Sequence, residues 1–198
     1  MTLLLATTSA DKLREIVPLM AGSPVRLLTL ADVPPMPVPA ETGATFWENA
    51  RQKALAYAAA SGMTVVAEDS GLAIDALDGA PGVRSARFLR PDATYAERFA
   101  AIHQRLDALP GGLHRARFVT ALAVARDNTI LFETETRVDG VIALQASGTR
   151  GFGYDPIFCY VPIGKTTAEM TPDEKAAVSH RARAFRDLRR ALQTSAFD

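Results

Sequence analysis

The first twenty residues restrict the possible folds more than any other stretch of this sequence. Thr2 to Thr7 is an apolar run of strand length, and residues 12–20 then carry apolar side chains at helical spacing. Ser9, which stands between the two, is a residue type that caps helix N-termini. A strand, a tight loop and a helix in direct succession predict an α/β fold.

The next segments continue this alternation. Four prolines between residues 31 and 40 exclude a helix there and predict an extended loop. Thr45 and Glu48 then form a capping-box pattern, and Gly62 is a natural helix stop, so we expect an alanine-rich helix between them.

A short buried strand is predicted at Thr64 to Ala67, followed by a loop that begins with Glu68, Asp69 and Ser70. Ligands in open α/β sheets lie at the carboxyl ends of strands, and a turn there would bring both carboxylates toward one cleft. Carboxylate oxygens are suitable ligands for Mg²⁺. The ordinary alternative is a turn aspartate beside an exposed glutamate, and these residues alone do not decide between the two.

The second half of the chain predicts further strands and helices. A helix is expected at residues 94–109, a hairpin at 115–125 and 130–138 with its turn at Asp127-Asn128, and a further strand at 141–144. Residues 148–156 form a glycine-rich loop. The last helix runs from Pro172 to Leu192, with Thr171 as its N-cap, or else Ser179 caps a separate final helix.

Composition excludes several classes of protein. The chain has 198 residues, enough for one domain or two closely joined lobes, with 22 basic and 22 acidic side chains and no net charge. This balance argues against a duplex nucleic acid as the main partner, because such binding depends on a surplus of Lys and Arg. The single cysteine, Cys159, cannot form an intrachain disulfide and is expected to be a buried structural thiol. No signal peptide or membrane span is predicted, so we expect a cytoplasmic protein.

Four more groups of residues could bind a phosphorylated ligand. The loop at residues 7–12 leads into a helix N-terminus, which attracts anions. Asn49 and Lys53 share a helix face, although such a pair is usually solvated. The aromatic side chains at residues 152–155 could stack on a base or pack into the core. The fourth group is basic and lies near the final helix: Lys175, His180 and Arg181.

In this order the groups resemble the inosine/xanthosine triphosphate pyrophosphatase family. The resemblance lies in LLLATTSADKLREI at the start, ETGATFWENARQKA at 41–54 and VVAEDSGLAIDALDGAPGVRSARF at 65–88. It continues with GTRGFGYDPIF at 148–158 and GKTTAEMTPDEKAAVSHRARA at 164–184. It therefore covers the chain nearly end to end.

The resemblance implies a single domain over residues 1–198, built as an elongated mixed β-sheet flanked by helices, with two lobes and a central active-site cleft. It implies a homodimer and hydrolysis of non-standard purine nucleoside triphosphates (ITP, dITP, XTP) to the monophosphate and pyrophosphate. Mg²⁺ is the implied cofactor, held by Glu41, Glu68 and Asp69, with Asp69 as the catalytic proton acceptor. The implied substrate-binding residues are Thr7, Thr8, Ser9, Ala10, Asp11, Lys12, Lys53, Ser70, Phe152, Gly153, Tyr154, Asp155, Lys175, His180 and Arg181.

Three positions depart from the family pattern. Ser9 stands where the family usually has Asn, Glu68 where Asp is common, and Asp11 where Gly is frequent. Ser9 can still cap the helix, and Glu68 keeps the negative charge, but Asp11 adds a negative charge beside the phosphate loop.

Selectivity can be argued from the edge of the base. Hypoxanthine and xanthine present an O6 acceptor and an N1–H donor, and adenine reverses both. We therefore expect Asp155 to accept from N1–H, and Arg181 or His180 to donate to O6.

Three other functions are alternatives for a chain with these motifs. A pyrophosphatase for modified pyrimidine nucleotides would share the early phosphate loop but lack the FGYDP and SHR segments. A non-catalytic nucleotide sensor would not need the acidic residues, and a nucleic-acid-binding protein is disfavoured by the zero net charge.

Overall fold

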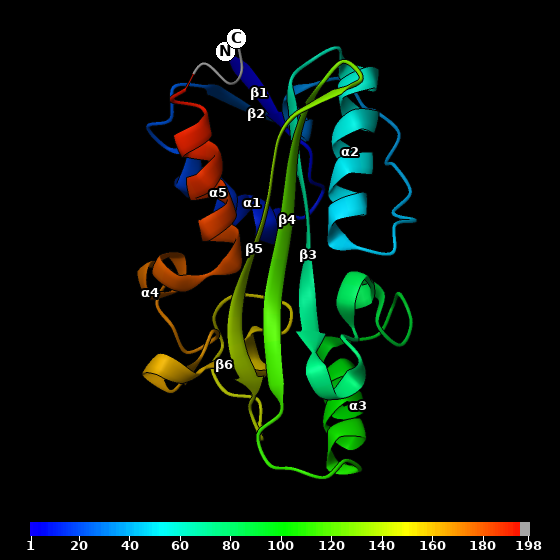
Figure 1. Cartoon of the computed structure of the whole chain (residues 1–198), viewed down its shortest axis with the longest axis vertical. Coiled ribbons are helices and arrows are strands. Elements are labelled where there is room, and N and C mark those ends of the chain that lie inside the picture. The colour runs from blue at the N-terminus through cyan, green and yellow to red at the C-terminus, as the bar shows by residue number, and fades with distance from the viewer. Residues whose placement is uncertain (195–198) are drawn as a thin grey trace. The chain divides into compact units, whose positions relative to one another are not determined.

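The computed structural model describes residues 1–194 as two compact units (Figure 1). Unit 1 comprises residues 1–70 and 120–136 together with the C-terminal segment from His180, and unit 2 comprises residues 71–119 and 137–179. The predicted phosphate loop and acidic residues belong to unit 1. The predicted glycine-rich loop and Lys175 belong to unit 2.

Seven strands form one mixed sheet in the order β2-β1-β3-β4-β5-β6-β7. The strands are β1 (Thr2–Leu5), β2 (Arg26–Thr29), β3 (Val65–Ile74), β4 (Arg115–Arg126), β5 (Thr129–Ile142), β6 (Phe158–Tyr160) and β7 (Lys165–Thr166). β1 pairs in parallel with β2 and β3, whereas β6 is antiparallel to both β5 and β7. This confirms the predicted mixed sheet of an α/β protein.

Five α-helices accompany the sheet within residues 1–194. They are α1 (Ala10–Met20), α2 (Phe46–Ser61), α3 (Tyr95–Asp107), α4 (Pro172–Val178) and α5 (His180–Ala191). Three of them begin at a capping box, in which a threonine side chain accepts from the backbone of a glutamate whose side chain accepts from the threonine backbone. The sequence predicts the boxes of α2 and α4, and that of α3 is new. The pairs are Thr45 with Glu48, Thr94 with Glu97, and Thr171 with Glu174. Local sequence thus specifies where these helices start.

Unit 1 is organised around buried aliphatic residues of its strands. Leu3 and Leu5 of β1 and Val66 of β3 are fully buried, and they belong to one cluster with Ile16 of α1 and Phe185 of α5. In Figure 1, α5 lies on one side of the unit 1 strands and α2 on the other. A strand with helices over both faces needs apolar side chains on both, which explains the unbroken apolar run in β1.

Unit 2 has its own core. Leu72 and Ile74 of β3 pack with Ile102 of α3, Tyr154 and Phe158. Phe118 of β4 lies against Phe158 with ring centroids 4.4 Å apart. Each unit therefore buries its own set of apolar side chains.

Two predicted boundaries are wrong, and one open alternative is decided. β3 does not end at Ala67 but continues through Glu68, Asp69 and Ser70 to Ile74. The expected strands at 130–138 and 141–144 are a single strand, β5. The final helical segment is divided at Ser179 into α4 and α5, which is the second of the two predicted arrangements.

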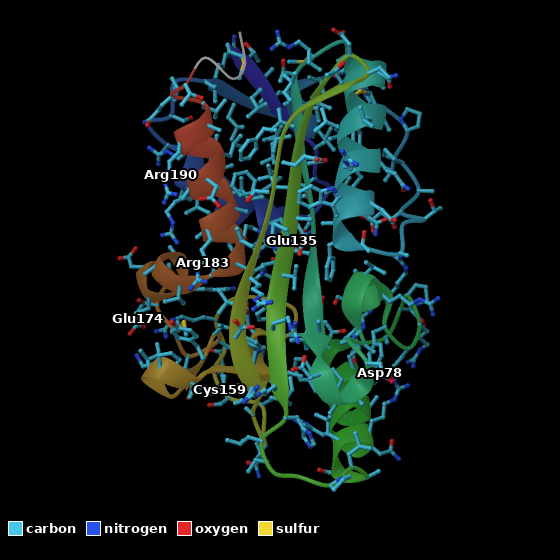
Figure 2. The ribbon with its side chains drawn as sticks, in the orientation of Figure 1. Asp78, Glu135, Cys159, Glu174, Arg183 and Arg190 are labelled. Atoms are coloured by element: carbon cyan, nitrogen blue, oxygen red, sulfur yellow. The ribbon has the colours of Figure 1, made fainter. Side chains whose placement is uncertain are left out.

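Cys159 lies on β6 in unit 2 (Figure 2) and is partly rather than fully buried. Burial raises the pKa of its thiol, which keeps it protonated near neutral pH. Within residues 1–194, no helix is both long and apolar enough to span a membrane.

Candidate active site

The loop between β1 and α1 presents a helix N-terminus, as predicted. Ser9 caps α1 by accepting from the backbone N–H of Lys12 at 3.3 Å, and its own N–H donates to the Thr7 hydroxyl at 3.2 Å. Asp11, in the first turn, pairs with Arg14. The added negative charge of Asp11 is therefore balanced within the same turn of the helix.

Glu68 lies beside this helix start, inside unit 1. Its side chain has no exposed surface, and Lys12 Nζ lies 2.8 Å from its Oε1. Arg181 Nε lies 3.6 Å from the same oxygen. Burial acts to raise the pKa of Glu68, but the charges of Lys12 and Arg181 outweigh burial and hold that pKa far below its ordinary value. Glu68 is therefore a carboxylate at any physiological pH.

Arg181, near the start of α5, connects several predicted residues. Its guanidinium pairs with Glu15 of α1 and donates to the Ser70 hydroxyl at 2.9 Å. The neighbouring His180 is also buried, and its carbonyl accepts from Thr136 of β5 at 2.7 Å. Unit 1 thus brings Lys12, Ser70, His180 and Arg181 into one region, as the resemblance implied.

Asp69 has a different set of contacts. Asn49 of α2 donates its Nδ2 to Asp69 Oδ2 at 2.9 Å, and the backbone N–H of Ser70 donates to Asp69 Oδ1 at 3.0 Å. Burial raises the pKa of Asp69 above its ordinary value, and Lys53 and Asn49 offset this effect only in part. A carboxylate with a raised pKa is a better proton acceptor than an exposed one.

Lys53 of α2 joins Asp69 to Glu41. Its Nζ lies 2.6 Å from Glu41 Oε1 and 3.9 Å from Asp69 Oδ1. Burial opposes the charge on Lys53, but Asp69 and Glu41 outweigh it, so the pKa of Lys53 lies above its ordinary value. Two carboxylates from distant parts of the chain therefore converge on one lysine.

The hydrogen-bond and ion-pair partners of Glu68 differ from those of Asp69, because the strand does not end at Ala67. Both lie within β3, where consecutive side chains point to opposite faces. The partners of Glu68 come from α1 and α5, and those of Asp69 come from α2. Among residues 1–194, no three His, Cys, Asp or Glu side chains gather as they would around a metal ion. Glu41 and Asp69 share Lys53 as a partner.

Of the predicted base-binding residues, Phe152, Asp155 and Lys175 contact one another within unit 2. Asp155 is buried; its Oδ1 accepts from the Thr167 hydroxyl at 2.7 Å and its Oδ2 from the Phe152 N–H at 2.7 Å. Lys175 also pairs with Asp155. A Cβ at Gly151 would lie 2.0 Å from Asp155 Oδ2, so this approach of the backbone requires glycine.

The two aromatic residues of this loop differ in how deeply they are buried. Tyr154 is buried in the unit 2 core, and its hydroxyl donates to the carbonyl of Ser85 at 2.9 Å. Phe152 is less buried, and the Lys175 ammonium lies 5.3 Å from the centre of its ring. Of the two, Phe152 has the surface that a base could stack on.

Sequence reasoning missed two of these partners and undervalued a third. Glu15 follows Lys12 by three residues, and this spacing on a helix could have placed it on the same face. Thr167 shows no local signal, because its turn after β7 is brought to Asp155 by tertiary structure. Asn49 was noted but judged more typical of a solvated face, yet it is completely buried.

The sequence model of the Ham1 family matches residues 3–191. This chain belongs to the Ham1 family. Two of its relatives match it over almost its whole length. It is 40% identical over 194 residues to a dITP/XTP pyrophosphatase of Exiguobacterium sibiricum, covering 98% of each sequence. A dITP/XTP pyrophosphatase of Geobacillus kaustophilus is 44% identical over 186 residues, which are 94% of this chain and 91% of the relative.

Solved structures agree with this membership of the Ham1 family. The structure of a HAM1 protein from Coxiella burnetii superposes with a TM-score of 0.88 at 35% identity, covering 98% of both chains. The fold and the family predicted from the motifs are therefore confirmed.

Proposed function

We propose that this chain hydrolyses non-standard purine nucleoside triphosphates, such as dITP, ITP and XTP, to the monophosphate and pyrophosphate. The single observation that carries the proposal is the convergence of Glu41 and Asp69 on Lys53. In the proposal Asp69 is the general base and Asp69 and Glu41 bind the cation, and the chain's relatives are named dITP/XTP pyrophosphatases. Hydrolysis of modified pyrimidine nucleotides is not favoured by these relatives.

Mg²⁺ is the proposed cofactor, and the donor set fits it. Glu41 and Asp69 offer hard carboxylate oxygens, and Mg²⁺ typically binds one or two carboxylates together with waters and substrate phosphates. Both carboxylates lie beside the single positive charge of Lys53. When bound, the ion supplies Lewis-acid stabilisation of the triphosphate charge.

In the proposal, different residues of the chain bind the triphosphate and activate the attacking water. A triphosphate carries about four negative charges near neutral pH, and the α1 N-terminus with Lys12 and Lys53 provides positive potential to bind it. Asp69 takes a proton from the attacking water. The new bond joins the water oxygen to the α-phosphorus, and the bond from that phosphorus to the bridging oxygen breaks, so pyrophosphate leaves with the electron pair.

Base recognition in the proposal follows the edge of a 6-oxopurine. Arg181 or His180 would donate to O6, and adenine would be rejected because its 6-amino group is itself a donor. The role of Asp155 in accepting from N1–H stays a prediction. Its oxygens already accept from Phe152, Thr167 and Lys175, which gives it a second role in ordering the loop.

Product analysis tests the proposal directly. Purified protein is incubated with Mg²⁺ and with dITP, XTP, dATP, dGTP or dUTP, and pyrophosphate and orthophosphate are measured separately. We expect pyrophosphate from dITP and XTP at a kcat/KM at least about a hundredfold above that for dATP, as expected for mismatched polar groups. Orthophosphate as the first product, or equal rates with every base, would refute the proposal.

The homodimer and the cytoplasmic location implied by the resemblance are also proposals. Light scattering after size-exclusion chromatography should give twice the chain mass of 21.2 kDa. Cell fractionation of the native protein should recover it with cytoplasmic enzymes. A monomer or a membrane-bound pool would contradict the respective proposal.

A further inference from the structure

We infer that Asn49 is a positioning residue for the two carboxylates of the proposed active site, Asp69 and Glu41. The nitrogen and the oxygen of its side-chain amide fix Asp69 relative to the loop that carries Glu41. The inference rests on the proposed function and deepens it. It assigns no chemical step to Asn49 itself.

The contacts of Asn49 involve both ends of its side chain. Its Nδ2 donates to Asp69 Oδ2 at 2.9 Å, and its Oδ1 accepts from the backbone N–H of Gly43 at 2.8 Å. Gly43 lies two residues after Glu41. One rigid planar group therefore connects the proposed general base to the loop that carries the other carboxylate.

The surroundings of Asn49 leave little freedom. Its side chain is completely buried, near the first turn of α2, whose start is defined by the capping box of Thr45 and Glu48. A Cβ on Gly43 would lie 2.7 Å from Glu48 Cβ and 2.8 Å from Asn49 Oδ1. The close approach of the loop to Asn49 therefore depends on glycine at position 43.

No other side chain of this size reproduces both contacts. Aspartate would lose the donor and place a third carboxylate beside Asp69. Leucine has a similar volume but offers neither donor nor acceptor, which leaves the Gly43 N–H and one oxygen of Asp69 without these partners. Asparagine supplies a donor on one side and an acceptor on the other.

With Asn49 and the Ser70 N–H each holding one oxygen, the carboxylate plane of Asp69 is defined. Groups that orient metal ligands and catalytic bases in this way typically change metal affinity or activity by about 10–100-fold when removed. We therefore expect Asn49 to affect kcat and the affinity for the divalent ion, but not the KM for dITP at saturating Mg²⁺.

The test compares Asn49→Leu with Glu48→Ala as a matched control. Glu48 is the adjacent residue and accepts from the N–H groups of Ala44 and Thr45, but it has no contact with Asp69. Both variants disturb the start of α2, and thermal unfolding measures that disturbance. We expect Asn49→Leu to lower kcat roughly 10–100-fold, and Glu48→Ala to stay within about twofold of wild type despite a similar loss of stability.

A second readout does not depend on turnover. Mn²⁺ binding to each protein, followed by the electron paramagnetic resonance of the free ion, should weaken roughly tenfold or more in Asn49→Leu but not in Glu48→Ala. Combining Asn49→Leu with Asp69→Asn should lower kcat little beyond Asp69→Asn alone, because Asn49 acts through Asp69.

The outcomes separate this inference from the proposed function. If wild-type protein releases no pyrophosphate from dITP, the proposed function fails. If wild type is active and Asn49→Leu retains its kcat and Mn²⁺ affinity, the inference is overturned. Losses that add fully in the Asn49→Leu/Asp69→Asn double variant, or equal losses in Glu48→Ala, would assign Asn49 a purely structural role and also overturn it.

Discussion

Glu68 and Asp69 are consecutive residues of β3, yet their surroundings shift their carboxyl pKa values in opposite directions. On the Glu68 side, Lys12 and Arg181 pair with Glu68, and Arg181 also pairs with Glu15. On the Asp69 side, one positive charge on Lys53 faces Asp69 and Glu41. The pKa of Glu68 is lowered and that of Asp69 is raised.

The opposite pKa shifts show that consecutive residues of β3 can have different roles. Glu68 lies in an ion-pair network with Lys12 and Arg181. Asp69 shares Lys53 with Glu41, and two carboxylates beside one lysine are suitable ligands for a divalent cation. We therefore propose that Glu68 orders Lys12 and Arg181, and that Asp69 and Glu41 hold the metal ion.

Replacing Glu68 should have the largest effect on stability. Glu68→Gln leaves Lys12 and the buried Arg181 without this carboxylate, and removing one partner of a buried pair costs about 3–5 kcal/mol. Urea denaturation at pH 7 would measure the loss. A change below about 1 kcal/mol, the range of exposed pairs, would contradict the assignment of Glu68 to a buried network.

The same variant should alter the dependence of stability on pH. Because the folded pKa of Glu68 lies below its ordinary value of 4.5, its ionisation stabilises the fold above that pH and the contribution is lost as pH falls below it. Wild type should therefore lose stability on acidification more steeply than Glu68→Gln. Parallel stability curves of the two proteins between pH 3 and 6 would contradict this prediction.

Asp69→Asn should separate activity from stability. We expect kcat for dITP to fall about a hundredfold or more, as for loss of a general base. In the absence of metal, the variant should unfold at a higher temperature than wild type at pH 7, because burial makes the ionised Asp69 unfavourable. A near-normal kcat would contradict the role of Asp69 as general base. A variant less stable than wild type would contradict the unfavourable burial of the ionised Asp69.

Glu41→Gln should chiefly weaken the binding of Mg²⁺. Lys53 keeps Asp69 as a partner, but the cation-binding pair loses one charge. The Mg²⁺ concentration that gives half-maximal activity should rise about tenfold or more. An unchanged Mg²⁺ requirement would place the ion elsewhere.

The smallest effect is expected from an ion pair outside both networks. Arg51 of α2 pairs with Glu133 of β5, and the Arg51 side chain is 49% exposed. Arg51→Ala should cost less than about 1 kcal/mol of unfolding free energy and leave kcat unchanged. A loss of activity comparable to that of Glu41→Gln would show that surface charge, and not the buried networks, governs the reaction.

The solvent-exposed charges of α5 illustrate the limit of local reasoning. Figure 2 shows Arg183 near the start of this helix and Arg190 near its end. The adjacent Arg181 is buried and contacts Glu15 and Ser70. The sequence SHRARAFRDLRR contains five arginines, and nothing local shows that Arg181 is the buried one.

The sequence by itself determined the helix starts, the α/β class and the membership of the family, because capping residues, apolar periodicity and motif order are local properties. Tertiary structure alone decided that β3 continues through Glu68 and Asp69 and that Asn49 is buried. The reason is physical: the extent of a strand and the burial of a polar side chain depend on partners that the chain brings from elsewhere. For Glu68 these partners are Lys12 and Arg181, and for Asp69 they are Asn49 and Lys53.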